Sequence, residues 1–256
     1  MRHIAADRIF NSLSQIQFGA EVDGYFLPEP ASAIFAKGQQ NDVPMILGFT
    51  RDESSNAIRQ AKNLEEYRAA AQKAYGDKAQ EFLKFYPAAN DAEARAAGAD
   101  AAREAGMEGN MRAHAVAQAK TGKAPAYLYM LSRVQPYTPG VVFADHDPAT
   151  AGAYHTGDVP YWFQTLDSLN IFRITRSWTK YDRDLTDKMS NILISFAKTG
   201  DPSAAGVPGW PRTNLVDERL MEFGDSIRVL PVNSKRIDFM TGMAAVGGGV
   251  RSGARD

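Results

Sequence analysis

The sequence predicts an α/β fold in which a mostly parallel sheet is flanked by helices. Two short apolar runs, 44–50 and 126–132, have the length of buried strands, and each is followed by a polar loop. Between them, residues 62–120 are rich in Ala, Glu, Lys, Arg and Gln and favour helices. A further helix is expected over 182–199. Strands that alternate with helical segments in this way are typical of the α/β class.

The first half of the chain contains the less regular elements. Residues 1–42 are mixed in character and include a turn-like segment, VDGYFLPEP, at 22–30. Within the helical segment, Pro87 interrupts the pattern, and Gly106 and Gly109 weaken it. Several helices are therefore expected there, and not one long helix.

The second half contains the clearest helix, over 182–199, which Gly200 is suited to end. Its apolar residues recur at helical spacing: Leu185, Met189, Ile192, Leu193 and Phe196. Residues 219–223 and 227–230 predict a small hairpin around Gly224 and Asp225. A Gly-rich tail over 241–256 is expected to be disordered, and residues 1–240 are expected to form one part of a single domain.

The composition excludes several classes of protein. The chain has 256 residues, of which 44% are apolar and 23% charged, close to the average for globular proteins. Its 29 Lys and Arg residues nearly cancel its 30 Asp and Glu residues, so neither nucleic acid nor an acidic membrane surface is an expected partner. Cysteine is absent, which excludes disulfides, Cys-ligated zinc and a thiol nucleophile.

The sequence gives little information about the cellular compartment. No stretch approaches the roughly 18 apolar residues that a membrane-spanning helix needs, so no membrane span is expected. Residues 1–10, MRHIAADRIF, lack the continuous apolar core of a signal peptide. The localisation stays open, and secretion or the periplasm are among the alternatives for the parent protein.

Two residues that follow the predicted strands are candidates for catalysis. Glu53 comes just after the first strand, and His155 follows the second strand and its loop, among small residues. Catalytic groups of open α/β sheets gather on loops beyond the carboxyl ends of the strands. Each residue taken singly is more simply explained as a loop acid or a structural histidine. An acid followed by a histidine in this order is, however, the arrangement that α/β-hydrolases use.

Three segments of the chain resemble the type-B carboxylesterase family, which is cholinesterase-like. They are 22–54 (VDGYFLPEP to NDVPMILGFTRDES), 152–163 (GAYHTGDVPYWF) and 194–211 (ISFAKTGDPSAAGVPGWP). The resemblance covers most of the chain in the family's order. It implies that residues 1–240 are the C-terminal portion of an α/β-hydrolase fold, incomplete without the N-terminal half of the same domain.

The resemblance also implies roles for individual residues. Glu53 falls on the acid of the family's catalytic triad and His155 on its base. Asp158 falls where the family usually has a glutamate close to the active site, which implies a supporting role. Trp210 and Pro211 fall on a motif that we interpret as structural.

The aromatic residues after His155 have two interpretations. They could line a substrate pocket, but an aromatic cluster near the end of a strand is more often part of the core. The residues are Tyr161, Trp162 and Phe163.

The chain departs from the family pattern in its nucleophile. No G-x-S-x-G pentapeptide occurs in the 256 residues, and the Gly-Gly oxyanion loop is also absent. Ser54 stands where the family often has glycine, and Ser203 where asparagine is common. We therefore expect a carboxylic ester hydrolase whose serine lies in the missing half, with a small carboxylic ester as substrate and no cofactor. This chain alone is expected to be inactive.

One alternative function and one alternative site stay open. The family also contains members that have lost the triad and act as binding or adhesion modules, although the presence of both Glu53 and His155 favours the enzyme. Asp145, His146 and Asp147 are metal-like residues, but adjacent positions in one loop rarely converge on one ion, so no metal is expected. His114, among alanines on a predicted helix, is expected to be a surface or packing residue.

Overall fold

The computed structural model describes residues 4–12 and 20–247, and the chain divides between Gln40 and Asn41 into two compact units. The first unit contains α1 (Ala6–Ser12) and α2 (Ala31–Ala36). Between these helices, the Asp23 carboxylate accepts the backbone N–H groups of Tyr25, Phe26 and Leu27 at 2.8–3.0 Å. These hydrogen bonds hold the turn that the sequence predicts over 22–30, and they lower the pKa of Asp23.

The second unit is built on a four-stranded sheet in the order β1-β2-β3-β4. The strands are β1 (Met45–Thr50), β2 (Ala126–Leu131), β3 (Arg219–Phe223) and β4 (Ile227–Pro231). β1 and β2 pair in parallel, as do β2 and β3, whereas β3 and β4 form an antiparallel hairpin. The predicted α/β fold with a mostly parallel sheet is confirmed.

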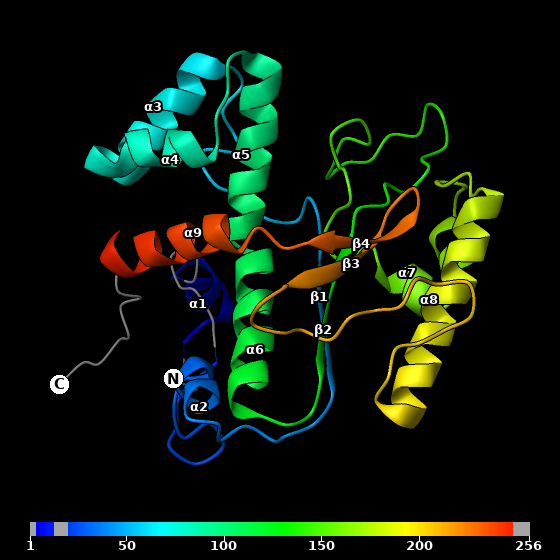
Figure 1. The fold of residues 1–256 in the computed structure, drawn as a ribbon. Coiled ribbons are helices and arrows are strands. Elements are labelled where there is room, and N and C mark those ends of the chain that lie inside the picture. Colours follow the sequence, from blue (N-terminus) through cyan, green and yellow to red (C-terminus); the bar gives the residue numbers. More distant parts are fainter. Residues whose placement is uncertain (1–3, 13–19, 248–256) are drawn as a thin grey trace. The chain divides into compact units, whose positions relative to one another are not determined.

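Helices cover both faces of this sheet (Figure 1). Along β2, Tyr127 and Leu131 pack on the face that carries α7 (Val159–Trp162) and α8 (Lys180–Thr199). The residues that alternate with them, Ala126, Leu128 and Met130, pack on the opposite face, which carries α6 (Met107–Thr121) and α9 (Ser234–Gly247). Because side chains alternate between the faces of a strand, a strand that is covered on both sides is a continuous apolar run. That is the pattern of residues 126–131.

The segment between β1 and β2 is helical and has its own core. It comprises α3 (Leu64–Tyr75), a short 3₁₀ turn at Gly76–Lys78, α4 (Ala79–Phe85), α5 (Asp91–Ala105) and α6. Asn63 and Asn90 cap α3 and α5, since each side chain accepts a backbone N–H at the start of its helix. As the sequence predicts, Gly106 separates two helices, whereas Gly109 lies inside α6.

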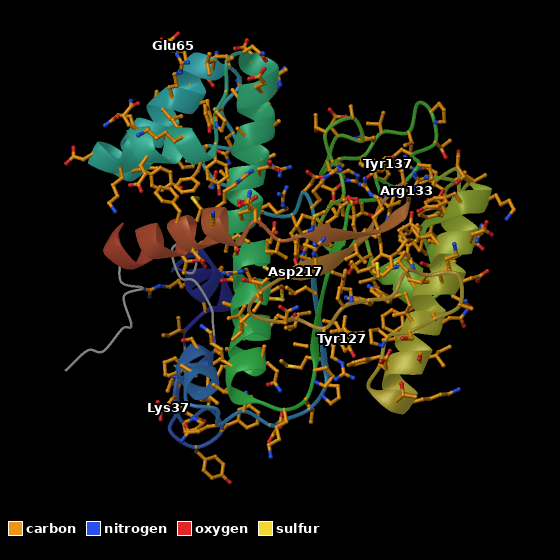
Figure 2. The ribbon with its side chains drawn as sticks, viewed as in Figure 1. Lys37, Glu65, Tyr127, Arg133, Tyr137 and Asp217 are labelled. Atoms are coloured by element: carbon orange, nitrogen blue, oxygen red, sulfur yellow. The ribbon has the colours of Figure 1, made fainter. Side chains whose placement is uncertain are left out.

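The amphipathic helix α8 has a defined start and end. Thr179 and Asp182 form a capping box, and Gly200 ends the helix in the left-handed conformation with φ 73°. The predicted helix is thus confirmed, with its start two residues earlier, at Lys180. The fully buried Asp182 carboxylate also accepts the Tyr161 hydroxyl at 2.9 Å and the Arg133 Nε at 2.8 Å. Figure 2 labels Arg133, which follows β2.

Two further predictions concern the last part of the chain. Trp210, predicted to be structural, is buried in the core and donates its Nε1–H to the Leu128 carbonyl at 3.0 Å. The predicted disordered tail begins at residue 241, but α9 continues to Gly247, so that boundary needs correction. On the preceding turn of α9, Ile237 and Met240 are buried in two different cores and so attach the helix to the rest of the unit. Residues 248–256 lie outside the described part of the chain.

Within 4–12 and 20–247, no helix is long and apolar enough to cross a membrane.

A buried carboxyl group connects α5 to α9. Glu104 is 3% exposed, accepts the Tyr86 hydroxyl at 2.8 Å and lies 2.9 Å from the Arg236 Nε of α9. Burial raises the pKa of Glu104 to about 7, although the positive charge of Arg236 opposes the rise. The folded state therefore keeps a proton that the unfolded chain, with the ordinary carboxyl pKa of 4.5, has already released.

This raised pKa predicts a pH-dependent stability. The contribution of protonated Glu104 to the free energy of unfolding is fully present below about pH 4.5 and is lost as pH rises through about 7. We expect Glu104→Gln, which stays neutral, to remove a fall in the free energy of unfolding on the order of 3 kcal/mol between those pH values. Urea titrations at several pH values measure it, with Glu65→Gln on the exposed face of α3 as control. An unchanged pH slope in Glu104→Gln would contradict the assignment.

Candidate active site

The first candidate side chain lies in the turn that follows β1. Glu53 comes three residues after Thr50, and its Oε1 accepts the Thr50 backbone N–H at 3.0 Å. The side chain is only 5% exposed. One carboxylate oxygen is therefore fixed by the end of the strand, and the other is directed away from it.

The second candidate lies in the loop that follows β2. His155 Nδ1 is 2.5 Å from Glu53 Oε2, so the structure brings together the two residues that the sequence pairs. An ionised carboxylate can only accept a hydrogen bond, and Nδ1 therefore carries the proton in this pair. The imidazole is 75% exposed, which leaves its other nitrogen free to act on a group that approaches from solvent. Their triad roles stay a prediction.

The two loops are joined beside this pair by Asp52. Its backbone N–H donates to the Ala153 carbonyl at 3.0 Å, and its Oδ2 accepts the Ala153 N–H at 2.9 Å. Burial alone would raise the pKa of Asp52, but the Ala153 N–H and the cations Arg51 and Arg59 hold it below its ordinary value. Asp52 is therefore an anion that fastens the His155 loop to the Glu53 turn.

This junction requires a glycine in the His155 loop. Gly152 has φ 59°, and a Cβ there would lie 2.4 Å from Asp52 Oδ2. Both the left-handed backbone and the close carboxylate therefore exclude a side chain at this position.

On its other side, the Glu53 turn is attached to helix α6. The Ser54 Oγ accepts the backbone N–H of Met107, the first residue of α6, at 3.2 Å. A Cβ on Gly106 would lie 2.5 Å from this Oγ. The serine that stands where the family often has glycine thus caps a helix from a distant part of the chain.

Asp158 lies at the start of α7 and faces β2. Its Oδ2 accepts the Tyr129 hydroxyl at 2.7 Å, and the same hydroxyl accepts the Trp162 Nε1–H at 3.2 Å. Burial raises the pKa of Tyr129, and the charge of Asp158 adds to the rise. The Tyr129 ring covers Gly48 of β1, where a Cβ would lie 1.9 Å from a ring carbon. The predicted supporting role of Asp158 stays a prediction, with Tyr129 as its partner.

The three aromatic residues after Asp158 lie in different surroundings. Tyr161 and Trp162 are buried in the core between the sheet and α8. This matches the interpretation of the aromatic cluster as part of the core. Tyr161 uses its hydroxyl on Asp182. Phe163 is 63% exposed, and a role for it in a substrate pocket stays a prediction.

The other two histidines considered as candidates, His146 and His114, each have contacts of their own. The His146 ring stacks on Phe143 with centroids 4.2 Å apart and contacts the Tyr137 hydroxyl through Nε2 at 3.2 Å. Tyr137 is labelled in Figure 2, in the loops beyond β2. His114 Nδ1 contacts the Asn110 carbonyl of its own helix α6 at 2.8 Å. In the described residues, no group of three or more His, Asp or Glu side chains could hold a metal ion.

Asp52, Tyr129 and the residues that support the His155 loop were not predicted from the sequence. Asp52 adjoins a candidate acid and could have been noticed for that reason. No local signal marks Tyr129, because it alternates with apolar residues like any strand residue and its partner is 29 positions away.

Comparisons with known proteins identify the family of this chain. A family model described as "Carboxylesterase family" matches residues 4–240. The chain is 29% identical over 214 residues to the fumonisin B1 esterase of Sphingopyxis macrogoltabida, covering 82% of this chain and 37% of that protein. It is 25% identical over 204 residues to the para-nitrobenzyl esterase of Bacillus subtilis (strain 168), covering 78% and 38%. The chain thus spans less than two fifths of the length of these curated relatives.

A solved structure of a PNB esterase shares the fold. The TM-score is 0.60 at 21% identity, over 93% of this chain and 49% of the solved chain.

The Asp52 junction gives a prediction about stability. Gly152→Ala should lower the free energy of unfolding more than Gly140→Ala, which is a matched control. Both glycines have positive φ, but a Cβ at Gly140 meets nothing within 4 Å. For the control, we expect backbone strain to lower the free energy of unfolding by about 1–2 kcal/mol. Gly152→Ala should lower it by about 1–3 kcal/mol more, because the Ala153 N–H loses its partner. Equal losses in urea titrations would mean that the junction contributes nothing.

Proposed function

Because this chain belongs to the carboxylesterase family and has part of the α/β-hydrolase fold, we propose that it supplies the acid and the base of a serine-dependent carboxylic ester hydrolase. The observation that carries the proposal is the 2.5 Å contact between His155 Nδ1 and Glu53 Oε2. Both residues lie on loops beyond the carboxyl ends of adjacent parallel strands. That edge of an α/β sheet is where catalytic groups gather.

In the proposed reaction, His155 is first a general base. Its exposed nitrogen removes the proton of a serine hydroxyl as the oxygen attacks the ester carbonyl. The imidazolium then donates this proton to the leaving alcohol, and an acyl-serine forms. The same nitrogen then deprotonates a water molecule that attacks the acyl carbonyl, and the imidazolium returns this proton to the serine oxygen as the carboxylic acid is released. Glu53 holds the imidazole in the tautomer with a proton on Nδ1 and stabilises the imidazolium.

The serine and the oxyanion donors of this reaction come from outside the 256 residues. The chain has no G-x-S-x-G pentapeptide, and it spans 37% and 38% of two esterase relatives. β1 has a strand neighbour only on its β2 side within the described sheet. An unpaired strand edge of this kind accepts a further strand, so the free edge of β1 is where we place the other half of the domain. The substrate is a small carboxylic ester.

The proposal predicts activity that depends on both halves. The chain alone should hydrolyse p-nitrophenyl esters no faster than its His155→Ala variant, because it lacks a nucleophile. Co-expressed with the N-terminal half of the Bacillus subtilis para-nitrobenzyl esterase, it should gain activity. In that complex, Glu53→Gln should lower kcat on the order of 10⁴-fold, since the imidazole then adopts the wrong tautomer.

Two controls make this experiment decisive. Co-elution in size-exclusion chromatography establishes that the halves have assembled. Glu65→Gln, an exposed carboxylate of α3, should leave the rate unchanged. A co-eluting complex without activity would favour the alternative of a binding module, and a rate insensitive to His155→Ala would exclude His155 as the base.

A further inference from the structure

The turn that carries His155 is strained. Thr156, the next residue, has φ 65°, a conformation that β-branched residues rarely adopt. The turn is closed by the Gly157 N–H, which donates to the Tyr154 carbonyl at 2.9 Å. Strained backbone of this kind persists only where the surrounding structure holds it in place.

Packing of the imidazole does not supply this support, because the ring is 75% exposed. The direction of His155 therefore depends on its own backbone and on one contact with Glu53. The support must act on the residues that flank the histidine.

The Gln135 side chain contacts both flanks. Its Oε1 accepts the Tyr154 hydroxyl at 2.9 Å, and its Nε2 donates to the Gly157 carbonyl at 3.0 Å. Gln135 is 3% exposed, so water does not compete for these hydrogen bonds. One amide group thus spans the turn from the residue before His155 to the second residue after it.

Arg176 fixes the orientation of this amide. Its Nε donates to Gln135 Oε1 at 2.7 Å, and its Nη2 donates to the Tyr154 hydroxyl at 3.3 Å. A guanidinium group can only donate, so the amide oxygen must face Arg176 and the amide nitrogen must face the Gly157 carbonyl. A reversed amide would place its N–H₂ against a cation.

Arg176 is itself an unusual residue. It is 5% exposed, and none of the described carboxylates forms an ion pair with it. Its charge is met by the neutral oxygens named above, by the Thr175 carbonyl at 3.3 Å and by the Tyr137 ring, 3.9 Å from the guanidinium carbon. A buried cation without a carboxylate is destabilising compared with an apolar residue, and what its hydrogen bonds provide in this chain is a fixed Gln135 amide.

We propose that Gln135 is a positioning residue for His155 and that Arg176 holds the Gln135 amide in the orientation this requires. The inference rests on the proposed role of His155 as the base. Without the amide, the flanks of the turn lose their common partner, Thr156 relaxes towards negative φ, and the imidazole moves away from Glu53.

Gln135→Glu separates positioning from simple structural support. At pH 8 a carboxylate beside Arg176 is ionised, so it gives the buried cation a counter-charge and still accepts the Tyr154 hydroxyl. It has no N–H for the Gly157 carbonyl. If Gln135 only supports the fold, the substitution changes the stability and leaves the His155 tautomer unchanged. If Gln135 positions His155, the tautomer changes in a chain that is still folded.

The measurement is two-bond ¹H–¹⁵N correlation of the ¹⁵N-labelled histidine rings in the 256-residue chain, with a thermal melt of each variant. His155 is assigned by its loss in His155→Gln. We expect the Nδ1–H tautomer to dominate in the unsubstituted chain and the Nε2–H fraction to rise severalfold in Gln135→Glu, which should still melt in one cooperative transition. Gln80→Glu, at an exposed position of α4, should change neither.

A second variant tests the same inference through the strained turn. Thr156→Gly removes the strain, so the rise in the Nε2–H fraction caused by Gln135→Glu should be smaller in that background. Identical His155 spectra for Gln135→Glu and the unsubstituted chain, with both folded, would overturn the inference. The measurement needs neither substrate nor serine, so a positive result with an inactive assembled complex would refute the esterase proposal alone.

Discussion

The parallel, in-register pairing of β1 with β2 is the constraint on which the rest of the structure depends. It places Met45 beside Ala126 and Thr50 beside Leu131, so the two strands end at the same edge of the sheet. The loops that follow them carry Glu53 and His155, which are 102 positions apart in the sequence. A shift of one residue would turn every side chain of β1 to the opposite face and separate the pair.

Polar contacts secure this register at both ends of the strands. At the amino ends, the Asp42 carboxylate accepts the Lys123 and Ala124 N–H groups at 2.9–3.0 Å, just before β1 and β2 begin. At the carboxyl ends, the Arg51 N–H donates to the Leu131 carbonyl at 2.8 Å and Asp52 binds Ala153. Of the helices that separate the strands in sequence, α3, α4 and α5 share a core that Met240 of α9 also enters.

Small residues lie where these layers approach most closely. Gly48 leaves room for the Tyr129 ring, Gly106 for the Ser54 hydroxyl and Gly152 for the Asp52 carboxylate. In each case the neighbour of the glycine lies in or beside a loop of the Glu53–His155 pair, or on the strand beneath it. The site is therefore held by close backbone approaches, and the exposed imidazole depends on them more than on its own packing.

The sequence by itself determined the elements and the pairing of the candidate residues. Apolar runs gave the strands, helical spacing and Gly200 gave α8, and the resemblance selected Glu53 and His155. These signals are local, because a strand buried on both faces and an amphipathic helix record their surroundings in their own composition.

Only the tertiary structure decided what supports the site. Asp52, Tyr129, Gln135 and Arg176 each have a partner between 19 and 101 positions away, and no local sequence pattern predicts a partner at such a separation. For the same reason, the sequence alone did not decide whether Tyr161 and Trp162 line a substrate pocket or belong to the core. Which side of an aromatic residue is covered depends on how α7 and α8 fold back onto the sheet, and that is a property of the assembled layers.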